Sequence, residues 1–168
     1  MTIFAVDVGY HALSAVVAGI MFNNWEDSIP TSHSVIYVDD IAEYEPGYFY
    51  KRELPCILQI LNQLNNLPEY IIVDGYVYLD QSQTPGLGKH LYDALEGRSI
   101  VIGVAKTRFK DMSPEVEVFR GKSQRPIYVT AAGISDIKAK CLIKKMDGRY
   151  RIPAMLKLVD QLTKKHSL

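Results

Sequence analysis

The sequence predicts an α/β protein, with a mixed sheet of three antiparallel strands followed by βαβ units and C-terminal helices. Near the N-terminus, short β-branched and apolar runs follow one another closely, as antiparallel strands do. Further on, short continuous apolar runs, typical of buried parallel strands, alternate with helical segments. A chain of 168 residues can bury one core, so we expect a single domain over residues 1–168.

The three antiparallel strands are expected at residues 2–8, 12–20 and 34–38. Gly9-Tyr10-His11 is typical of a tight turn between the first two strands. His11 and His33 are expected in loops.

A helix is expected next, because five apolar residues recur at helical spacing: Leu54, Ile57, Leu58, Leu61 and Leu64. Pro55 suits its first turn, and Glu53 then lies at its N-terminus. The apolar runs 70–74 and 99–106 flank a helix-like segment, 86–97, and give a βαβ unit. Two weaker segments, 115–121 and 125–130, indicate a hairpin near the sheet edge. Helices at about 135–146 and 154–165 close the chain.

Composition excludes several classes of protein. The 19 basic and 19 acidic side chains cancel, so any nucleic acid must be held by a local patch rather than by the net charge. No apolar stretch approaches the roughly 18 residues that a membrane span needs, and the start lacks the basic region of a signal peptide. Cys56 and Cys141 lie in apolar helical runs and are expected to be buried thiols rather than a disulfide. A cytoplasmic location, away from membranes, is the expectation.

Two aspartates end or interrupt apolar strands. Asp7 lies inside the first strand and Asp74 ends the run 70–74. Taken singly, Asp74 before Gly75 suits a turn and Asp7 suits a capped edge position. Where strand ends meet, however, crowded carboxylates repel one another unless a cation lies between them. Oxygen ligands of this kind select Mg²⁺ or Mn²⁺, which assist phosphodiester hydrolysis. A ribonuclease H-like sheet provides such a geometry.

Six segments then resemble the motifs of the endonuclease V family, in the same order and rough spacing. They are VDVGY (6–10), YEPGYFYKRE (44–53), IIVDG (71–75), GLGKHL (86–91), IGVAK (102–106) and GRYRIP (148–153). Each is weak alone, and together they cover most of the chain.

The resemblance implies roles for individual residues. Asp7, Glu53 and Asp74 match the metal-binding acids, and Lys106 matches an active-site lysine that contacts the scissile phosphate; a solvated strand cap is the alternative for Lys106. The family also has an aromatic-proline wedge that is inserted at the lesion and a pocket for the damaged base. The matching wedge residues are Tyr44, Pro46, Gly47 and Tyr48, and those of the pocket or its support are Gly86, Leu87 and His90. A surface loop, and a partly buried helix residue for His90, are the alternative interpretations.

The chain departs from the family pattern at several positions. Asp80 stands at a histidine position, and Gln81-Ser82 replaces a basic pair, which predicts weaker nucleic-acid binding or a changed substrate. Asp160 stands where the family has a functional histidine and is either an accessory metal ligand or an exposed helix residue. Glu45 replaces a hydrophobic wedge residue.

The resemblance implies a Mg²⁺-dependent endonuclease, with Mn²⁺ as a substitute, that cuts near a deaminated purine such as inosine. Its partner is expected to be DNA or RNA, single-stranded or carrying a lesion. Two alternatives stay open. One is a diverged paralogue that binds nucleic acid without cutting it, and the other is a structure-specific nuclease with no preference for inosine. The sequence leaves the oligomeric state open.

Overall fold

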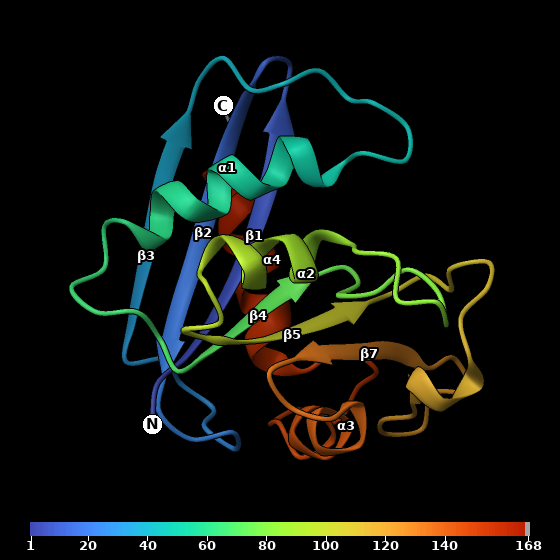
Figure 1. Cartoon of the computed structure of the whole chain (residues 1–168). Coiled ribbons are helices and arrows are strands. Elements are labelled where there is room, and N and C mark those ends of the chain that lie inside the picture. Colours follow the sequence, from blue (N-terminus) through green and yellow to red (C-terminus); the bar gives the residue numbers. More distant parts are fainter. Residues whose placement is uncertain (167–168) are drawn as a thin grey trace.

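The computed structural model describes residues 1–166, and within them seven strands form one mixed sheet in the order β3-β2-β1-β4-β5-β7-β6 (Figure 1). The strands are β1 (Ile3–His11), β2 (Ser14–Phe22), β3 (Ser32–Val38), β4 (Tyr70–Asp74), β5 (Ile100–Ala105), β6 (Glu117–Val118) and β7 (Ile127–Ala132). The helices are α1 (Tyr50–Leu61), α2 (Leu87–Ala94), α3 (Asp136–Lys144) and α4 (Ala154–Lys165), with a short 3₁₀ helix, η1 (Pro114–Val116).

The strand pairing confirms the predicted sheet. β1, β2 and β3 are antiparallel neighbours, while β4 lies parallel to both β1 and β5. The β4–α2–β5 segment is therefore the expected βαβ unit. β7 and β6 complete the far edge as an antiparallel pair.

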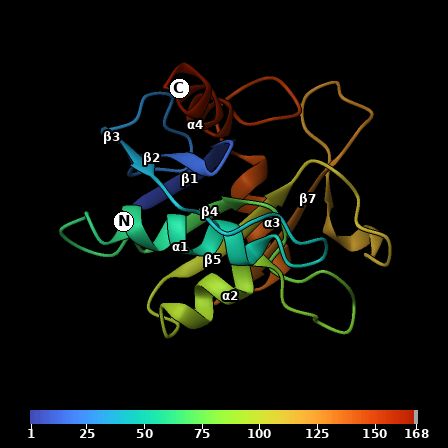
Figure 2. The same cartoon turned by 90° about the horizontal axis from the view of Figure 1, so that it is seen from above.

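Helices cover both faces of the sheet (Figures 1 and 2). On one face, α1 and α2 bury Ile57 and Leu91 against strand residues such as Phe4. On the other face, α3 and α4 bury Ile143 and Val159. The central strands thus have two buried faces, which explains why they are continuous apolar runs.

The first hairpin differs from the expectation. β1 continues through Gly9, Tyr10 and His11, and His11 pairs with Ser14. The turn is made instead by Ala12, in the left-handed backbone region at φ 53°, and Leu13. The predicted turn at Gly9-Tyr10-His11 is wrong, because pairing with β2 outweighs the preference of glycine for turns.

Four smaller expectations also need correction. His11 and His33 lie on strands, with exposed side chains. α1 begins at Tyr50, so Pro55 is inside the helix rather than in its first turn. Cys56 is buried, but Cys141 is exposed. The expected hairpin segment 115–121 supplies only the two residues of β6, because residues 114–116 form η1.

The helices of residues 1–166 include none that is long and apolar enough to cross a membrane.

Candidate active site

The sheet brings Asp7 and Asp74 to adjacent positions. β1 and β4 are paired in parallel up to Ala5 and Ile72, so Asp7 and Asp74 follow two residues later on neighbouring strands. Because side chains alternate between faces, both acids project to the face of Ala5 and Ile72. That face is the one covered by α3 and α4.

Helix α4 supplies the third acid. Met155 and Val159 are buried against the sheet, and Asp160, next to Val159, borders this apolar stripe. A narrow cleft between α4 and the strand ends is lined by Asp7, Asp74, Lys106 and Asp160, together with apolar side chains. A second hollow, of about 260 Å³, opens beside it and shares the three aspartates. We expected Asp7, Glu53, Asp74 and Asp160 to converge on one site, and the cleft brings together the three aspartates of this set.

The electrostatics of the cleft show that negative charge is poorly compensated. Burial, then the charges of Asp74 and Asp160, raise the pKa of Asp7 to about 7. Burial also raises the pKa of Asp74, against the opposing effect of Lys106. Burial acts in the same direction on Asp160, but hydrogen bonds from Lys164 and Asp7, together with the charge of Lys106, hold its pKa below its usual value.

Glu53 approaches the same acids from the opposite face of the sheet, in the first turn of α1. Burial and the charges of Asp74 and Asp7 raise its pKa to about 8. Its neighbour is Tyr10, whose hydroxyl lies beside the carboxyl without a hydrogen bond of regular geometry to any described residue. The Arg52 guanidinium stacks on the Tyr10 ring, 3.7 Å from its centroid. Tyr10 was not expected at the site, although it follows Asp7 by three positions in the VDVGY segment.

Lys106 directly follows β5, and its ammonium lies 3.7 Å from Asp74 Oδ2. The two side chains are 43% and 47% exposed, so water screens the pair and leaves the lysine accessible to a ligand. Lys106 therefore lines the acid cleft and places a positive charge beside Asp74.

The donor chemistry of the cleft fits a hard divalent cation, since it offers carboxylate oxygens with uncompensated charge. The geometry is less complete. In residues 1–166, no group of three or more His, Cys, Asp or Glu side chains is arranged to hold a metal ion. Cation binding would therefore require some of these carboxylates to change rotamer.

The wedge residues form an exposed turn before α1. Gly47 has φ +81°, and the Tyr48 amide donates to the Glu45 carbonyl over 2.9 Å. Tyr44 and Tyr48 are 62% and 47% exposed, so their rings are free to contact another molecule. Lys51 both pairs with Glu45 and lies over the Tyr48 ring, which partly offsets the acid introduced there.

The three expected pocket residues have different surroundings. Gly86 is required for packing, because a Cβ there would lie 2.6 Å from the Tyr76 carbonyl oxygen. Leu87 is fully buried, so it can support a pocket only from behind. His90 stacks on Tyr50, with ring centroids 3.7 Å apart, which links α2 to the segment that carries the wedge.

Asp80 is used within its own loop and lies away from the acid cleft. Its carboxylate accepts hydrogen bonds from the Thr84 amide at 3.0 Å and the Thr84 hydroxyl at 2.6 Å. These bonds lower the pKa of Asp80 and close a turn that leaves Gln81 and Ser82 exposed.

Comparison with known proteins decides the family. The sequence model of endonuclease V matches residues 1–161. The chain belongs to the endonuclease V family. This family consists of nucleases, so the chain is placed among hydrolases of phosphodiester bonds. Among curated relatives, endonuclease V of Nostoc punctiforme is 24% identical, over 94% of this chain and 79% of the relative.

Solved structures agree on the fold. The catalytic domain of human endonuclease V has a TM-score of 0.81 at 20% identity, covering 98% of this chain and 81% of the human one. The Ciona intestinalis endonuclease V, crystallised with a DNA 23mer containing an inosine, also gives 0.81 at 20% identity, covering 98% and 84%. The ribonuclease H-like fold predicted from the sequence is confirmed.

Proposed function

We propose that this endonuclease V family member is a divalent-metal-dependent endonuclease that cuts DNA or RNA near a deaminated purine such as inosine. The observation that carries the proposal is the convergence of Asp7, Asp74, Asp160 and Lys106 on one cleft. The inosine preference is supported by the inosine-containing DNA in the Ciona intestinalis complex and by the exposed tyrosines before α1. The cytoplasmic location and the single domain expected from the sequence stay predictions.

Asp7 and Asp74 would hold the cation, Mg²⁺ or Mn²⁺, from the sheet. Asp160 and Glu53 would complete the ligand set from the helices on the two faces. Such a cation supplies an activated water nucleophile and neutralises charge on the attacked phosphate. Binding requires Asp7 and Glu53 to lose the protons that their raised pKa values favour, so affinity should rise with pH.

Lys106 would neutralise the charge that develops on the phosphate in the transition state. In the absence of substrate its ammonium rests against Asp74, 3.7 Å away. A phosphate entering the cleft would compete with Asp74 for this ammonium, and Asp74 would then be free to help hold the cation. The lysine thus keeps a partner before and after substrate binds.

The direct test is cleavage of labelled single strands of DNA and RNA that carry one inosine. The matched strands carry guanosine at that position, and each is incubated with Mg²⁺, with Mn²⁺ or with a chelator. We expect a cut near inosine only when metal is present. Cutting both strands equally would favour the structure-specific nuclease, and no cutting under any metal would overturn the enzymatic proposal.

The binding paralogue without nuclease activity is the second candidate, favoured by the exposed Gln81-Ser82 pair where the family has basic residues. Replacing both by arginine should tighten nucleic-acid binding and steepen its salt dependence, by a slope of about one to two. Affinity measured across salt concentrations checks this. The matched control is the double variant Asn65→Arg, Asn66→Arg. These two exposed residues precede the N-terminal end of β4, whereas Asp74 lies at its C-terminal end.

If the Asn65→Arg, Asn66→Arg control tightens nucleic-acid binding by the same amount, the bound nucleic acid does not pass the 80–84 loop. If binding tightens but no metal supports cutting, the binding paralogue is favoured, since better binding does not create a nucleophile.

A further inference from the structure

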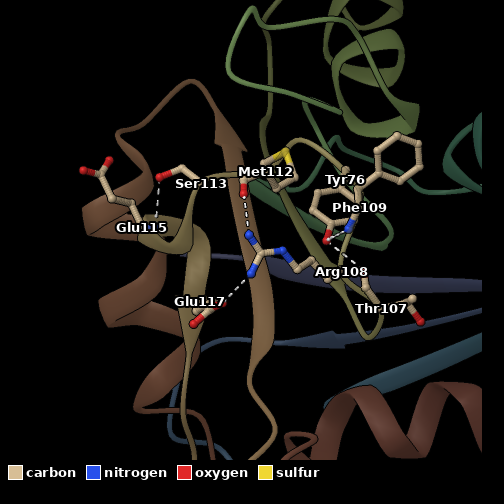
Figure 3. Close-up of polar contacts among 8 residues, drawn as sticks. All are labelled: Tyr76, Thr107, Arg108, Phe109, Met112, Ser113, Glu115 and Glu117. Carbon is tan, nitrogen blue, oxygen red and sulfur yellow. Dashed lines mark hydrogen bonds and ion pairs between the residues drawn. The ribbon is translucent and has the colours of Figure 1, made fainter.

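The loop after Lys106 is held by a side chain from the strand segment that carries Asp74. Tyr76 follows Asp74 by two positions and is 4% exposed. Its hydroxyl donates to the Thr107 carbonyl at 2.8 Å and accepts from the Phe109 amide at 3.1 Å (Figure 3). The Tyr76 hydroxyl is thus both donor and acceptor, and both of its partners are backbone groups within three residues after Lys106.

The Tyr76 ring is itself fixed. It packs edge-on against Phe109, with centroids 5.9 Å apart, and against Tyr128 of β7 at 6.3 Å. Ala105, Met112 and Val116 belong to the same apolar cluster. The hydroxyl therefore has little freedom to leave the loop backbone.

The rest of the loop is folded back on itself. Arg108 donates to the Met112 carbonyl at 3.2 Å and lies 3.5 Å from Glu117 Oε1 (Figure 3). The Ser113 hydroxyl accepts from the Glu115 amide at 3.2 Å and caps the N-terminus of η1. These contacts shape residues 108–117 but do not reach the segment after β4, whereas the Tyr76 bonds join that segment to the loop.

Arg151 binds the backbone of Lys106 itself. Its guanidinium donates to the Lys106 carbonyl, and also to the Pro126 carbonyl at 2.8 and 3.0 Å. Arg151 lies just before α4, the helix of Asp160. The segments that carry Asp74, Lys106 and Asp160 are therefore joined by side-chain bonds to the backbone around the lysine.

We propose that Tyr76 is a positioning residue, which fixes the backbone from which Lys106 extends so that the ammonium stays beside Asp74 and the cleft. The proposal rests on the proposed function of Lys106 at the scissile phosphate. A small displacement of a catalytic group has a large effect on rate, because the reacting atoms must be aligned. A phenylalanine at position 76 would keep the ring packing and remove both hydrogen bonds.

Tyr76→Phe should therefore lower kcat about tenfold and leave KM within about twofold, because it acts on the transition state rather than on strand binding. The matched control is Tyr128→Phe, which removes a hydroxyl from the same aromatic cluster. No hydrogen bond joins the Tyr128 hydroxyl to residues 107–109 in the described part of the chain. This control should retain wild-type kinetics.

A double-mutant cycle separates positioning from a general structural effect. In a Lys106→Ala background, followed in single turnovers at high enzyme concentration, Tyr76→Phe should cost no further activity, because the group it positions is gone. Equal losses in both backgrounds, or an unchanged kcat in the single variant, would overturn the proposal.

Amide hydrogen exchange tests the same inference without any cleavage. The Phe109 amide should exchange faster in Tyr76→Phe, but not in Tyr128→Phe or Lys106→Ala. Unchanged protection of Phe109 in Tyr76→Phe would overturn the inference even in an active enzyme. A wild-type protein that cuts no strand would overturn the proposed function instead, and Phe109 exchange would still show whether Tyr76 holds the loop.

Discussion

Replacing Asp7 with asparagine is expected to lower the rate of strand cleavage by about a thousandfold or more. The amide has nearly the same shape but carries no charge, so the proposed cation site would lose one of its ligands. The several kcal/mol that a cation contributes to the transition state would be lost with it. Single-turnover cleavage of an inosine-containing strand measures the effect.

Asp39→Asn is the matched control, because Asp39 is an exposed acid that follows β3 and lies outside the cleft. It should cut at the wild-type rate. Metal-free Asp7→Asn should also unfold at a temperature no lower than the wild type at pH 8, since it removes a carboxylate that burial and its neighbours disfavour. A thermally stable Asp7→Asn variant that cuts normally would remove Asp7 from the mechanism.

The second large effect is a fall in stability of the metal-free protein as pH rises from about 4 to about 8. Folding raises the pKa of Asp7 from 3.8 to about 7 and that of Glu53 from 4.5 to about 8. Between those values the unfolded chain has lost protons that the folded chain still binds, so deprotonation favours unfolding. Above pH 8 the loss is complete, on the order of 2 kcal/mol per carboxyl after screening by water.

Thermal unfolding in a chelator, at half-unit steps of pH, measures this slope. Asp7→Asn should reduce it, while Asp39→Asn should leave it unchanged. Saturating Mg²⁺ should flatten or reverse it, because a cation that binds only the ionised, folded cluster stabilises that state. A slope that is the same in Asp7→Asn as in the wild type would mean that other groups titrate in this range.

Much of this fold could be predicted because its central strands are short apolar runs with both faces buried. Asp7 and Asp74 stood out for the same reason, since a carboxylate in such a run is costly unless it is paired, hydrogen-bonded or bound to a cation. The end of β1 was not, because Gly9 suggests a turn locally while pairing with β2 extends the strand. The exposure of Cys141 depends on which face α3 turns toward the sheet.

The contacts around Lys106 lay beyond sequence reasoning. Tyr76 bonds to residues 31 and 33 positions away, and Arg151 bonds to a carbonyl 45 positions away. Neither pairing has a local pattern, because the partners are backbone groups that any residue could supply. The sequence also could not predict the rotamers of the acidic side chains. In these rotamers, no group of three or more His, Cys, Asp or Glu side chains in residues 1–166 is arranged to hold a metal ion.

The proposed mechanism requires the acids of β1, β4 and α4 to form one cation site. The most direct measurement is anomalous diffraction from crystals of the protein soaked in Mn²⁺, compared with crystals of Asp74→Asn. We predict an anomalous peak between the Asp7 and Asp74 carboxylates in the wild type, with Asp160 or Glu53 turned toward it, and none at that place in the variant. If wild-type crystals soaked in saturating Mn²⁺ show no anomalous peak in this cleft, although the same preparation cuts nucleic acid, these acids do not form the cation site.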